Sequence, residues 1–201
     1  MTSAHATVGQ VVTLRTDRLE LRPWREDEAD LARLRDIRSR PEVAGWLADR
    51  RPVTEPAAIL AMVRRWATLS EETSGRYGVW AVQPRGTDTV VGGVVLKPLP
   101  GLDNATYTAD IEAGWFLHPD SWGRGYATEA ARALLDREFA AGAPEIYAVV
   151  YPGNTASAAV ATRLGMRPLG LRSDRWYGGT PLEAFVRTNG GRGSAGRLAS
   201  A

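Results

Sequence analysis

The stretch that decides the fold reads WFLHPDSWGRGYATEAA between Trp115 and Ala131. An apolar segment enters a proline-containing turn, passes through a glycine-rich loop and continues into strong helix formers. Gly123 and Gly125 lack side chains, so the backbone turns tightly there and a bulky anion can approach it closely. The helix that we expect from Thr128 to Ala141 leaves its first N–H groups unpaired, and its dipole favours negative charge at that end. The sequence therefore predicts a phosphate-binding turn.

The spacing of this loop excludes the two commonest phosphate-binding motifs. A P-loop places Gly-Lys-Ser/Thr at the helix entry, where this chain has Tyr126, Ala127 and Thr128. A dinucleotide fingerprint needs Gly or Ala at the position of Thr128, and no acidic residue closes a following strand at the expected distance. The residues from Trp122 to Ala127 instead resemble the coenzyme A loop of the GNAT family of N-acetyltransferases, Arg/Gln-x-x-Gly-x-Gly/Ala, with Trp in place of the opening Arg or Gln.

Three further segments extend this resemblance, in the family's order, from about Leu14 to Thr188. Residues 154–157 and 163–166, Asn-Thr-Ala-Ser and Arg-Leu-Gly-Met, are similar to the family's Asn-x-x-Ser/Ala helix that ends in Leu-Gly-Phe. The opening TDRLELRPW at residues 16–24 and the segment IEAGWFL at residues 111–117 resemble the ribosomal-protein-alanine N-acetyltransferase (RimJ/RimL-like) subgroup. The chain is therefore identified as similar to acetyl-CoA-dependent N-acetyltransferases.

The resemblance implies a cofactor site and names its residues. Backbone groups of the glycine loop, Gly123, Arg124, Gly125, Tyr126, Ala127 and Thr128, would hold the diphosphate of acetyl-CoA. Asn154 would contact the pantetheine arm or a neighbouring backbone group, although Gly-Asn-Thr before a helix is also an ordinary N-cap. N–H groups of Trp115, Phe116 and Leu117 would polarise the thioester carbonyl, provided that the strand bulges near Gly114 and leaves them unpaired.

Acetyl transfer to an amine requires a base, because only the neutral amine attacks. A lysine amine has a pKa of about 10.4 and an α-amine one of about 7.7 to 8.0, so an N-terminal acceptor needs a weaker base. Glu112, two residues before Gly114, is the candidate for this base, and Asp110 on the same face of the strand is the alternative. The competing interpretation of Glu112 is an ion-paired or surface strand residue.

The departing thiolate needs a proton, and the residue that supplies it in many family members is missing. A Tyr commonly stands seven residues after the Asn, where this chain has Ala161. Ser157 is the candidate acid, with a helix-capping serine as the alternative and protonation by water as a third route. His118 is interpreted as a turn residue, and Tyr177 and Glu183 are further candidates on the acceptor side. Trp24, Trp46 and Trp176 fall near segments that wall the acceptor cleft in the family.

Composition limits the remaining function classes. The chain of 201 residues is 44% hydrophobic and contains no Cys and only two His, which excludes disulfides, thiolate metal sites and a Cys nucleophile. We therefore expect no metal cofactor. Net charge is +2 with scattered Arg and a single lysine, so no nucleic-acid partner is expected. No apolar run reaches membrane-spanning length and no signal peptide is evident, so no membrane partner and a cytoplasmic location are expected. The oligomeric state stays open, with a homodimer as one option.

The element order predicts an α/β protein with one mixed, mostly antiparallel sheet of about six or seven strands and about four flanking helices. We expect helices at 27–38, from a Thr54 cap, after the glycine loop and at 155–164, and a strand at 106–117. One domain at residues 11–188 would lie between flexible tails at 1–10 and 189–201.

Three functions fit these observations. An acetyl-CoA-dependent transfer to a primary amine, on a protein N-terminus or a small molecule, is favoured. A non-catalytic acyl-CoA-binding module and an acyltransferase that uses a different acyl-CoA are the alternatives.

Overall fold

A computed structural model describes residues 12–190. One mixed sheet runs in the order β1-β2-β3-β4-β5-β6-β8-β7, and every neighbouring pair is antiparallel except β5 and β6, which are parallel. Its strands are β1 (Leu14–Arg15), β2 (Leu19–Pro23), β3 (Gly78–Pro84), β4 (Gly92–Pro100), β5 (Tyr107–Leu117), β6 (Glu145–Val150), β7 (Arg167–Arg172) and β8 (Leu182–Thr188). Eight strands thus replace the predicted six or seven. The extra pairing comes from β1, which has only two residues and is too short to recognise from a sequence pattern.

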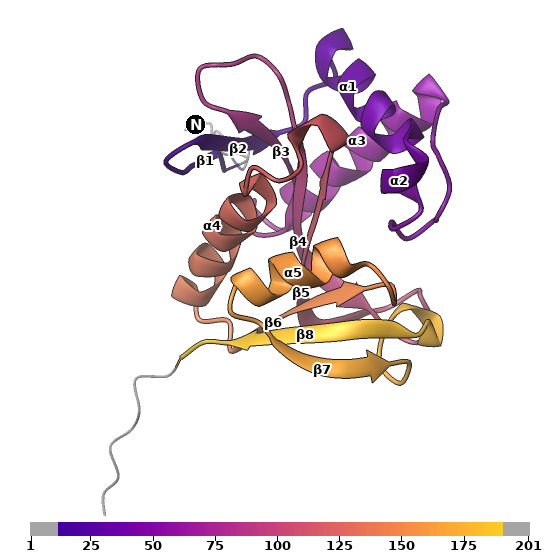
Figure 1. Ribbon diagram of the computed structural model, residues 1–201, viewed down its shortest axis with the longest axis vertical. Coiled ribbons are helices and arrows are strands. Elements are labelled where there is room, and N and C mark those ends of the chain that lie inside the picture. The colour runs from indigo at the N-terminus through magenta and orange to yellow at the C-terminus, as the bar shows by residue number, and fades with distance from the viewer. Residues whose placement is uncertain (1–11, 191–201) are drawn as a thin grey trace, which may run out of the picture.

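Five α-helices and two short 3-10 turns connect these strands (Figure 1). The helices are α1 (Glu28–Ser39), α2 (Pro41–Ala44), α3 (Pro56–Glu72), α4 (Tyr126–Ala140) and α5 (Thr155–Arg163), and the turns are η1 (Pro119–Ser121) and η2 (Tyr177–Gly179). The short helix α2 is additional to the four helices expected, and its four residues are too few to show a helical repeat in the sequence. The predicted Thr54 cap is wrong: Glu55 is the N-cap of α3, without a side-chain hydrogen bond, because Pro56 already suits the first helical position.

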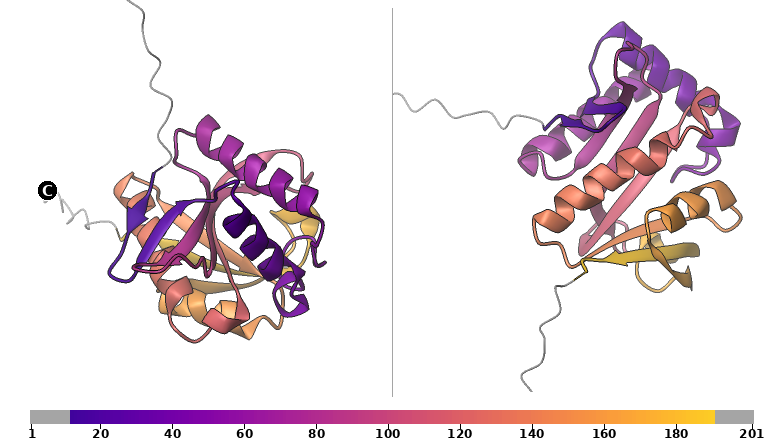
Figure 2. Two further views of the ribbon diagram at one scale, coloured as in Figure 1. Left: turned by 90° about the horizontal axis from the view of Figure 1, so that it is seen from above. Right: turned by 60° about the vertical axis from the view of Figure 1, so that its left-hand side comes forward.

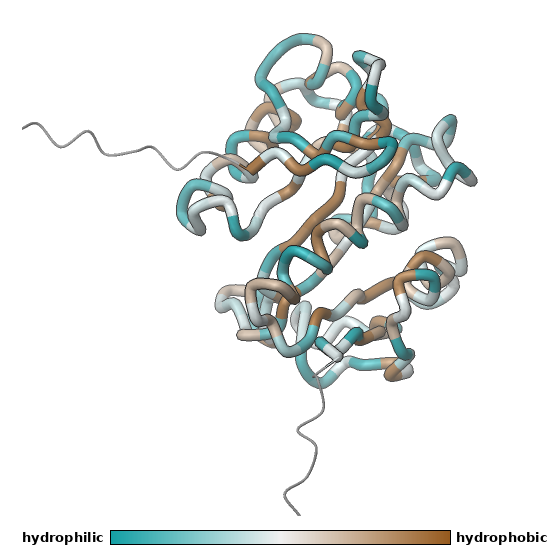
Figure 3. Tube along the Cα trace, turned by 90° about the vertical axis from the view of Figure 1, so that its left-hand side faces the viewer, coloured by the Kyte–Doolittle hydropathy of each residue, from teal (hydrophilic) through white to brown (hydrophobic). Residues whose placement is uncertain are grey.

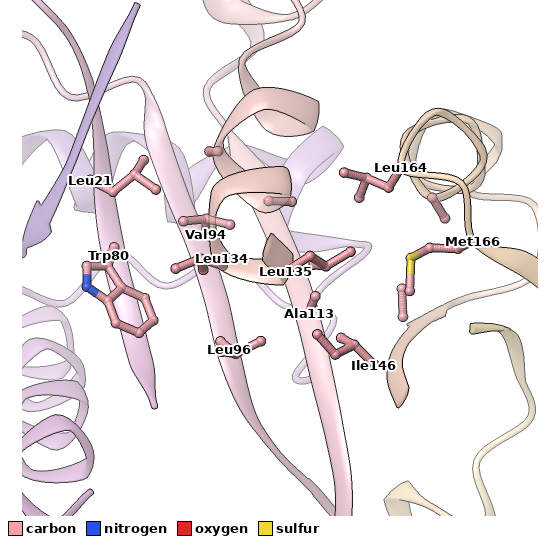
Figure 4. Close-up of a cluster of buried hydrophobic side chains, with 14 of the residues drawn as sticks. Leu21, Trp80, Val94, Leu96, Ala113, Leu134, Leu135, Ile146, Leu164 and Met166 are labelled. Atoms are coloured by element: carbon pink, nitrogen blue, oxygen red, sulfur yellow. The ribbon is translucent and has the colours of Figure 1, made fainter. Parts of the chain in front are cut away.

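The helices cover both faces of the sheet (Figure 2). Helices α4 and α5 pack on one face over a core that contains Val94, Leu134, Leu135 and Ile146, and Figure 4 shows these side chains between strands and helices. Helices α1 and α3 pack on the other face around Leu34, Ile37, Ile59 and the rings of Trp24 and Phe116. The hydropathy pattern agrees, since the central strands are hydrophobic and the outer loops hydrophilic (Figure 3).

A buried ion pair fixes α1 to β2. The Arg22 guanidinium donates to both carboxylate oxygens of Asp30 at 2.6 and 2.8 Å, and both side chains are about 5% exposed. Burial raises the pKa of Asp30, but hydrogen bonds from Arg22 and the Arg25 N–H outweigh it and lower the pKa below its usual value. Removing one partner of such a pair typically costs about 3 to 5 kcal/mol of folding free energy.

The residue that follows β8 is hydrogen-bonded to the end of α4 and to the segment after it. Asn189, expected at the start of the C-terminal tail, donates through its backbone N–H to the Pro144 carbonyl and through its side chain to the carbonyls of Phe139 and Ala143. The predicted N-terminal tail and the rest of the C-terminal tail fall outside the described residues, apart from Gly190. Within residues 12–190, no helix has both the length and the apolar character that crossing a membrane requires.

Candidate functional site

The site forms where β5 and β6 part. The two strands pair at a single position, Glu112 opposite Tyr147, although β5 continues for five residues beyond it. The divergence opens a cavity of about 780 Å³. Two of its walls are formed by residues 113–116 of β5 and by residues 148–150 of β6 with the following Tyr151. Met62 and Trp66 come from α3, and Trp46 comes from the loop after α2.

Beyond Glu112, the edge of β5 that faces β6 directs backbone N–H groups into the space between the two strands. The N–H of His118 donates to the Val91 carbonyl on the β4 side, and N–H directions alternate along an antiparallel strand. The N–H groups of Trp115 and Leu117 therefore point away from β4, and that of Phe116 points toward it. The indole of Trp122 donates to the Leu117 carbonyl at 3.0 Å, which agrees with this alternation.

The expected bulge near Gly114 is wrong. Pairing between β4 and β5 is regular from Gly92 opposite Leu117 to Pro98 opposite Ile111, and the register shifts only between Pro98 and Pro100. Within residues 12–190, no strand pairs with Trp115 and Leu117 on the side away from β4, for a different reason: the neighbouring strand on that side, β6, has diverged from β5. A sequence pattern within β5 cannot reveal this, because the cause lies in the path of another strand.

The glycine turn precedes α4 with the geometry expected of an anion cradle. Gly123 and Gly125 have φ angles of +74° and +78°, a region that side-chain-bearing residues rarely adopt. Gly125 is the N-cap of α4, which begins at Tyr126, two residues earlier than expected. Within residues 12–190, the first N–H group of α4 that donates to a carbonyl of this turn belongs to Glu129. It donates to the Gly125 carbonyl at 3.0 Å. Trp115, Phe116 and Asn154 line the cavity, whereas Leu117 and residues 123–128 lie beyond it.

Glu112 lies in the cavity wall with its carboxylate held by two partners. Its side chain is 11% exposed; Tyr177 donates from its hydroxyl to Oε2 at 2.5 Å, and the Lys97 ammonium lies 3.3 Å from the same oxygen. Lys97 stands directly opposite Glu112 on β4, so the two side chains share a face of the sheet. The Lys97 ammonium also donates to the Tyr177 hydroxyl at 3.0 Å. Oε2 is thus occupied.

Tyr177 reaches Glu112 from an irregular turn, η2. Its backbone φ is +50°, which is unusual for a residue with a side chain. Burial and the neighbouring Glu112 carboxylate raise the pKa of Tyr177 far above its ordinary value, so the phenol stays protonated and acts as a donor. Sequence reasoning named Tyr177 only as an acceptor-side candidate and missed Lys97. The one signal for Lys97 was that it is the only lysine in a chain rich in arginine.

Asn154 and Ser157 lie at the start of α5, and both line the cavity. The Asn154 side chain accepts a hydrogen bond from the Ser157 N–H at 3.1 Å, which confirms the N-cap interpretation. This cap uses the serine N–H, so the Ser157 hydroxyl is not needed for it. Ala161, at the position where many relatives carry Tyr, is fully buried in the core beneath α5.

The other candidates, apart from Trp46, do not line the cavity. Asp110 accepts hydrogen bonds from Arg175 and from the Trp176 indole, both at 2.8 Å, and is not part of the cavity wall. Glu183, on β8, also lies outside it. Among the three candidate tryptophans, only Trp46 lines the cavity, where it is 40% exposed. Trp24 is buried in the core beneath α1 and α3, and Trp176 is buried in a separate cluster with Tyr147.

His118 lies in the turn between β5 and η1. Its Nδ1 accepts from the Asp120 N–H at 3.2 Å, which caps η1. Burial opposes ionisation of Asp120, but hydrogen bonds from Ser121 and Arg33 outweigh it, and the pKa falls to about 2. In the part of the chain that the structure describes, no three His, Cys, Asp or Glu side chains are grouped so as to hold a metal ion.

Comparisons with known proteins agree with this geometry. A family model described as an acetyltransferase (GNAT) domain matches residues 18–167. The FsC-acetyl coenzyme A-N(2)-transacetylase of Aspergillus fumigatus is 32% identical over 163 residues, which cover 80% of this chain and 67% of that protein.

Solved structures show the same fold at lower identity. A GNAT-family acetyltransferase from Bacillus anthracis superposes with a TM-score of 0.70 at 21% identity, covering 89% of this chain and 99% of the other. RimL, a ribosomal L7/L12 alpha-N-protein acetyltransferase in complex with coenzyme A, superposes with a TM-score of 0.67 at 16% identity, covering 86% and 95%. The chain therefore belongs to the GNAT acetyltransferase family and is an N-acetyltransferase.

Proposed function

We propose that this enzyme transfers the acetyl group of acetyl-CoA to a primary amine by direct attack on the thioester, with Glu112 as the base. The observation that carries the proposal is the position of the Glu112 carboxylate. It lies in the cavity wall at the point where β5 and β6 separate, on the same strand as Trp115 and Leu117.

The described residues fit acetyl-CoA at two places. The N–H groups of residues 123–128 suit its diphosphate, because they lie at the N-terminal end of α4, where the helix dipole favours negative charge. The free edge of β5 suits the amide-containing pantetheine arm, which can pair with it as a strand would. Bound in this way, acetyl-CoA would supply the activated acetyl group. The N–H groups of Trp115 and Leu117 would donate to the carbonyl oxygen as it gains negative charge.

Glu112 would take the proton from the acceptor amine, directly or through a water. Its Oε2 is held by Tyr177 and Lys97, so Oε1 is the oxygen that remains for the proton. Tyr177 stays protonated and donates to Oε2, and the Lys97 ammonium lies 3.3 Å from the same oxygen. These two contacts would hold the carboxylate in place before the amine arrives. Glu112 is both ion-paired, as the competing interpretation held, and available for catalysis.

Ser157 is the proposed proton donor to the departing thiolate. Its hydroxyl belongs to a residue of the cavity wall at the start of α5, and the cap of this helix does not use it. The amine acceptor is proposed to be a protein N-terminus or a small molecule. The cavity wall carries Arg65, Lys97, Glu72 and Glu112 together with aromatic rings, so both kinds of acceptor find charged and apolar partners there.

Thiol release from acetyl-CoA across a panel of amines tests the proposal. The panel contains peptides with a free α-amine, polyamines, aminoglycosides and amino acids, and succinyl-CoA replaces acetyl-CoA in a parallel set. We expect turnover with at least one amine and its loss in Glu112→Gln, with the affinity for CoA unchanged. Glu183→Gln, a matched change outside the cavity, keeps activity. Tight CoA binding without turnover of any amine would contradict the proposal and favour a non-catalytic acyl-CoA-binding module.

A further inference from the structure

A second network lies at the other end of the proposed cofactor path, between the β1–β2 turn and the first turn of α4. Its centre is the Glu129 carboxylate, and both oxygens are occupied. Oε1 accepts from the Thr16 hydroxyl at 2.5 Å and from the Arg18 N–H at 3.0 Å. Oε2 accepts from Arg18 Nε at 2.7 Å and lies 2.6 Å from Arg18 Nη2.

The same arginine also reaches the glycine turn. Arg18 Nη1 donates to the Arg124 carbonyl at 3.0 Å, and its guanidinium lies over the Tyr126 ring, 5.1 Å from the centroid. A Cβ added to Gly125 would lie 3.4 Å from Arg18 Nη2. One side chain therefore contacts Arg124 and Tyr126, the residues on either side of Gly125, where the turn becomes a helix.

The charges explain why such a contact matters for an anion. Glu129 stands in the first turn of α4, where a carboxylate suits the helix dipole but repels a second anion at the same helix end. Hydrogen bonds from Thr16 and Arg18 outweigh burial and lower the pKa of Glu129, so it is ionised at neutral pH. Arg18 offsets this charge, and its side chain is still 52% exposed beside the turn.

We infer that Arg18 is a positioning residue for acetyl-CoA: it fixes the glycine turn through the Arg124 carbonyl and shields the diphosphate from the Glu129 carboxylate. The inference rests on the proposed function, in which the diphosphate lies on this turn. Arg18 acts on the cofactor end alone, because its contacts involve the β1–β2 turn and the start of α4 and none of the residues around Glu112.

Steady-state kinetics of Arg18→Ala with two acetyl donors tests the inference. With acetyl-CoA we expect KM to rise about tenfold, in the range of losing hydrogen bonds to charged groups, with kcat within about twofold of the wild type. Acetylpantetheine lacks the diphosphate, so its kcat/KM should not change. Loss of activity with both donors would point to a damaged fold and overturn the inference.

Two further variants separate shielding from an unspecific effect. In the double variant Arg18→Ala, Glu129→Gln the repelling charge is gone, and part of the lost affinity should return; an unchanged or larger loss would overturn the shielding role. Arg15→Ala is the matched control, because it removes an exposed arginine of the same hairpin whose partner is Glu20. Its KM for acetyl-CoA should equal that of the wild type.

The two proposals fail in distinguishable ways. If wild-type enzyme uses acetylpantetheine as well as acetyl-CoA, the diphosphate gains nothing from the glycine turn and the proposed cofactor site is wrong. If it prefers acetyl-CoA strongly but Arg18→Ala retains that preference, only the role of Arg18 is wrong.

Discussion

The two parts of the proposed site are built from different stretches of the chain. At the proposed cofactor end, backbone N–H groups of residues 123–128 and of β5 would provide the contacts, and side chains mainly hold that backbone in shape. At the acceptor end, three side chains from separate elements, Lys97, Glu112 and Tyr177, meet around one carboxylate oxygen. A backbone site depends on conformation, so it tolerates changes of exposed side chains. A side-chain site depends on the identity of each residue.

The largest expected effect is at the acceptor end. Replacing Glu112 by Gln keeps the shape of the side chain but removes the base, so we expect kcat/KM to fall by about 10² to 10⁴. Binding of CoA, measured by calorimetry, should stay within about twofold of the wild type. A parallel loss of CoA affinity would show that the two ends are not separate.

The cofactor end is tested by two substitutions in one turn. In Gly125→Val, a β-branched side chain must adopt a φ of +78° next to Arg18, so the turn distorts and CoA affinity should fall about 100-fold or more. In Arg124→Ala, the backbone keeps its path, and CoA affinity should change less than about threefold. Equal losses in both variants would mean that the arginine side chain, rather than the main chain, binds the cofactor.

Tyr177→Phe sharpens the role of the side chains around Glu112. The ring stays, but the hydroxyl that donates to Oε2 is lost, so the carboxylate is held in place less firmly. We expect kcat to fall about tenfold. The raised pKa of Tyr177 keeps the phenol neutral, so in the wild type no loss of activity near pH 10 should arise from its ionisation. Wild-type kcat in Tyr177→Phe would contradict a role for this hydrogen bond in catalysis.

Ser157→Ala has the smallest expected effect, because a thiolate can also leave unassisted. We expect kcat to fall about three- to tenfold and CoA affinity to stay unchanged, since the helix cap uses the Ser157 N–H. Asn154→Ala removes that cap and should cost about 1 kcal/mol of folding free energy, measured by denaturant unfolding. Wild-type kcat in Ser157→Ala would remove the serine from the mechanism.

The proposed cofactor end was more predictable from the sequence than the proposed acceptor end. The glycine turn was predictable, because two glycines, a preceding strand and a following helix are all local in the chain. Glu112 was found through its place in a strand motif, and the Asn154 cap through its neighbours. Lys97 and Tyr177 are 15 and 65 positions from Glu112, and their convergence depends on strand register and on the η2 turn. The free N–H groups of β5 were expected, but for the wrong reason, since they depend on the path of β6.

The single pairing between β5 and β6 has a consequence for local stability. Strands β6, β8 and β7 are joined to the rest of the sheet by one residue pair, Glu112 opposite Tyr147. The neighbouring strand pairs, β4–β5 and β6–β8, are paired along most of their length. Amide hydrogens near the Glu112–Tyr147 pair should therefore exchange with deuterium faster than those between β4 and β5. A cofactor arm lying along the free edge of β5 would bridge the two halves, so saturating CoA should slow this exchange on both sides of the split at once.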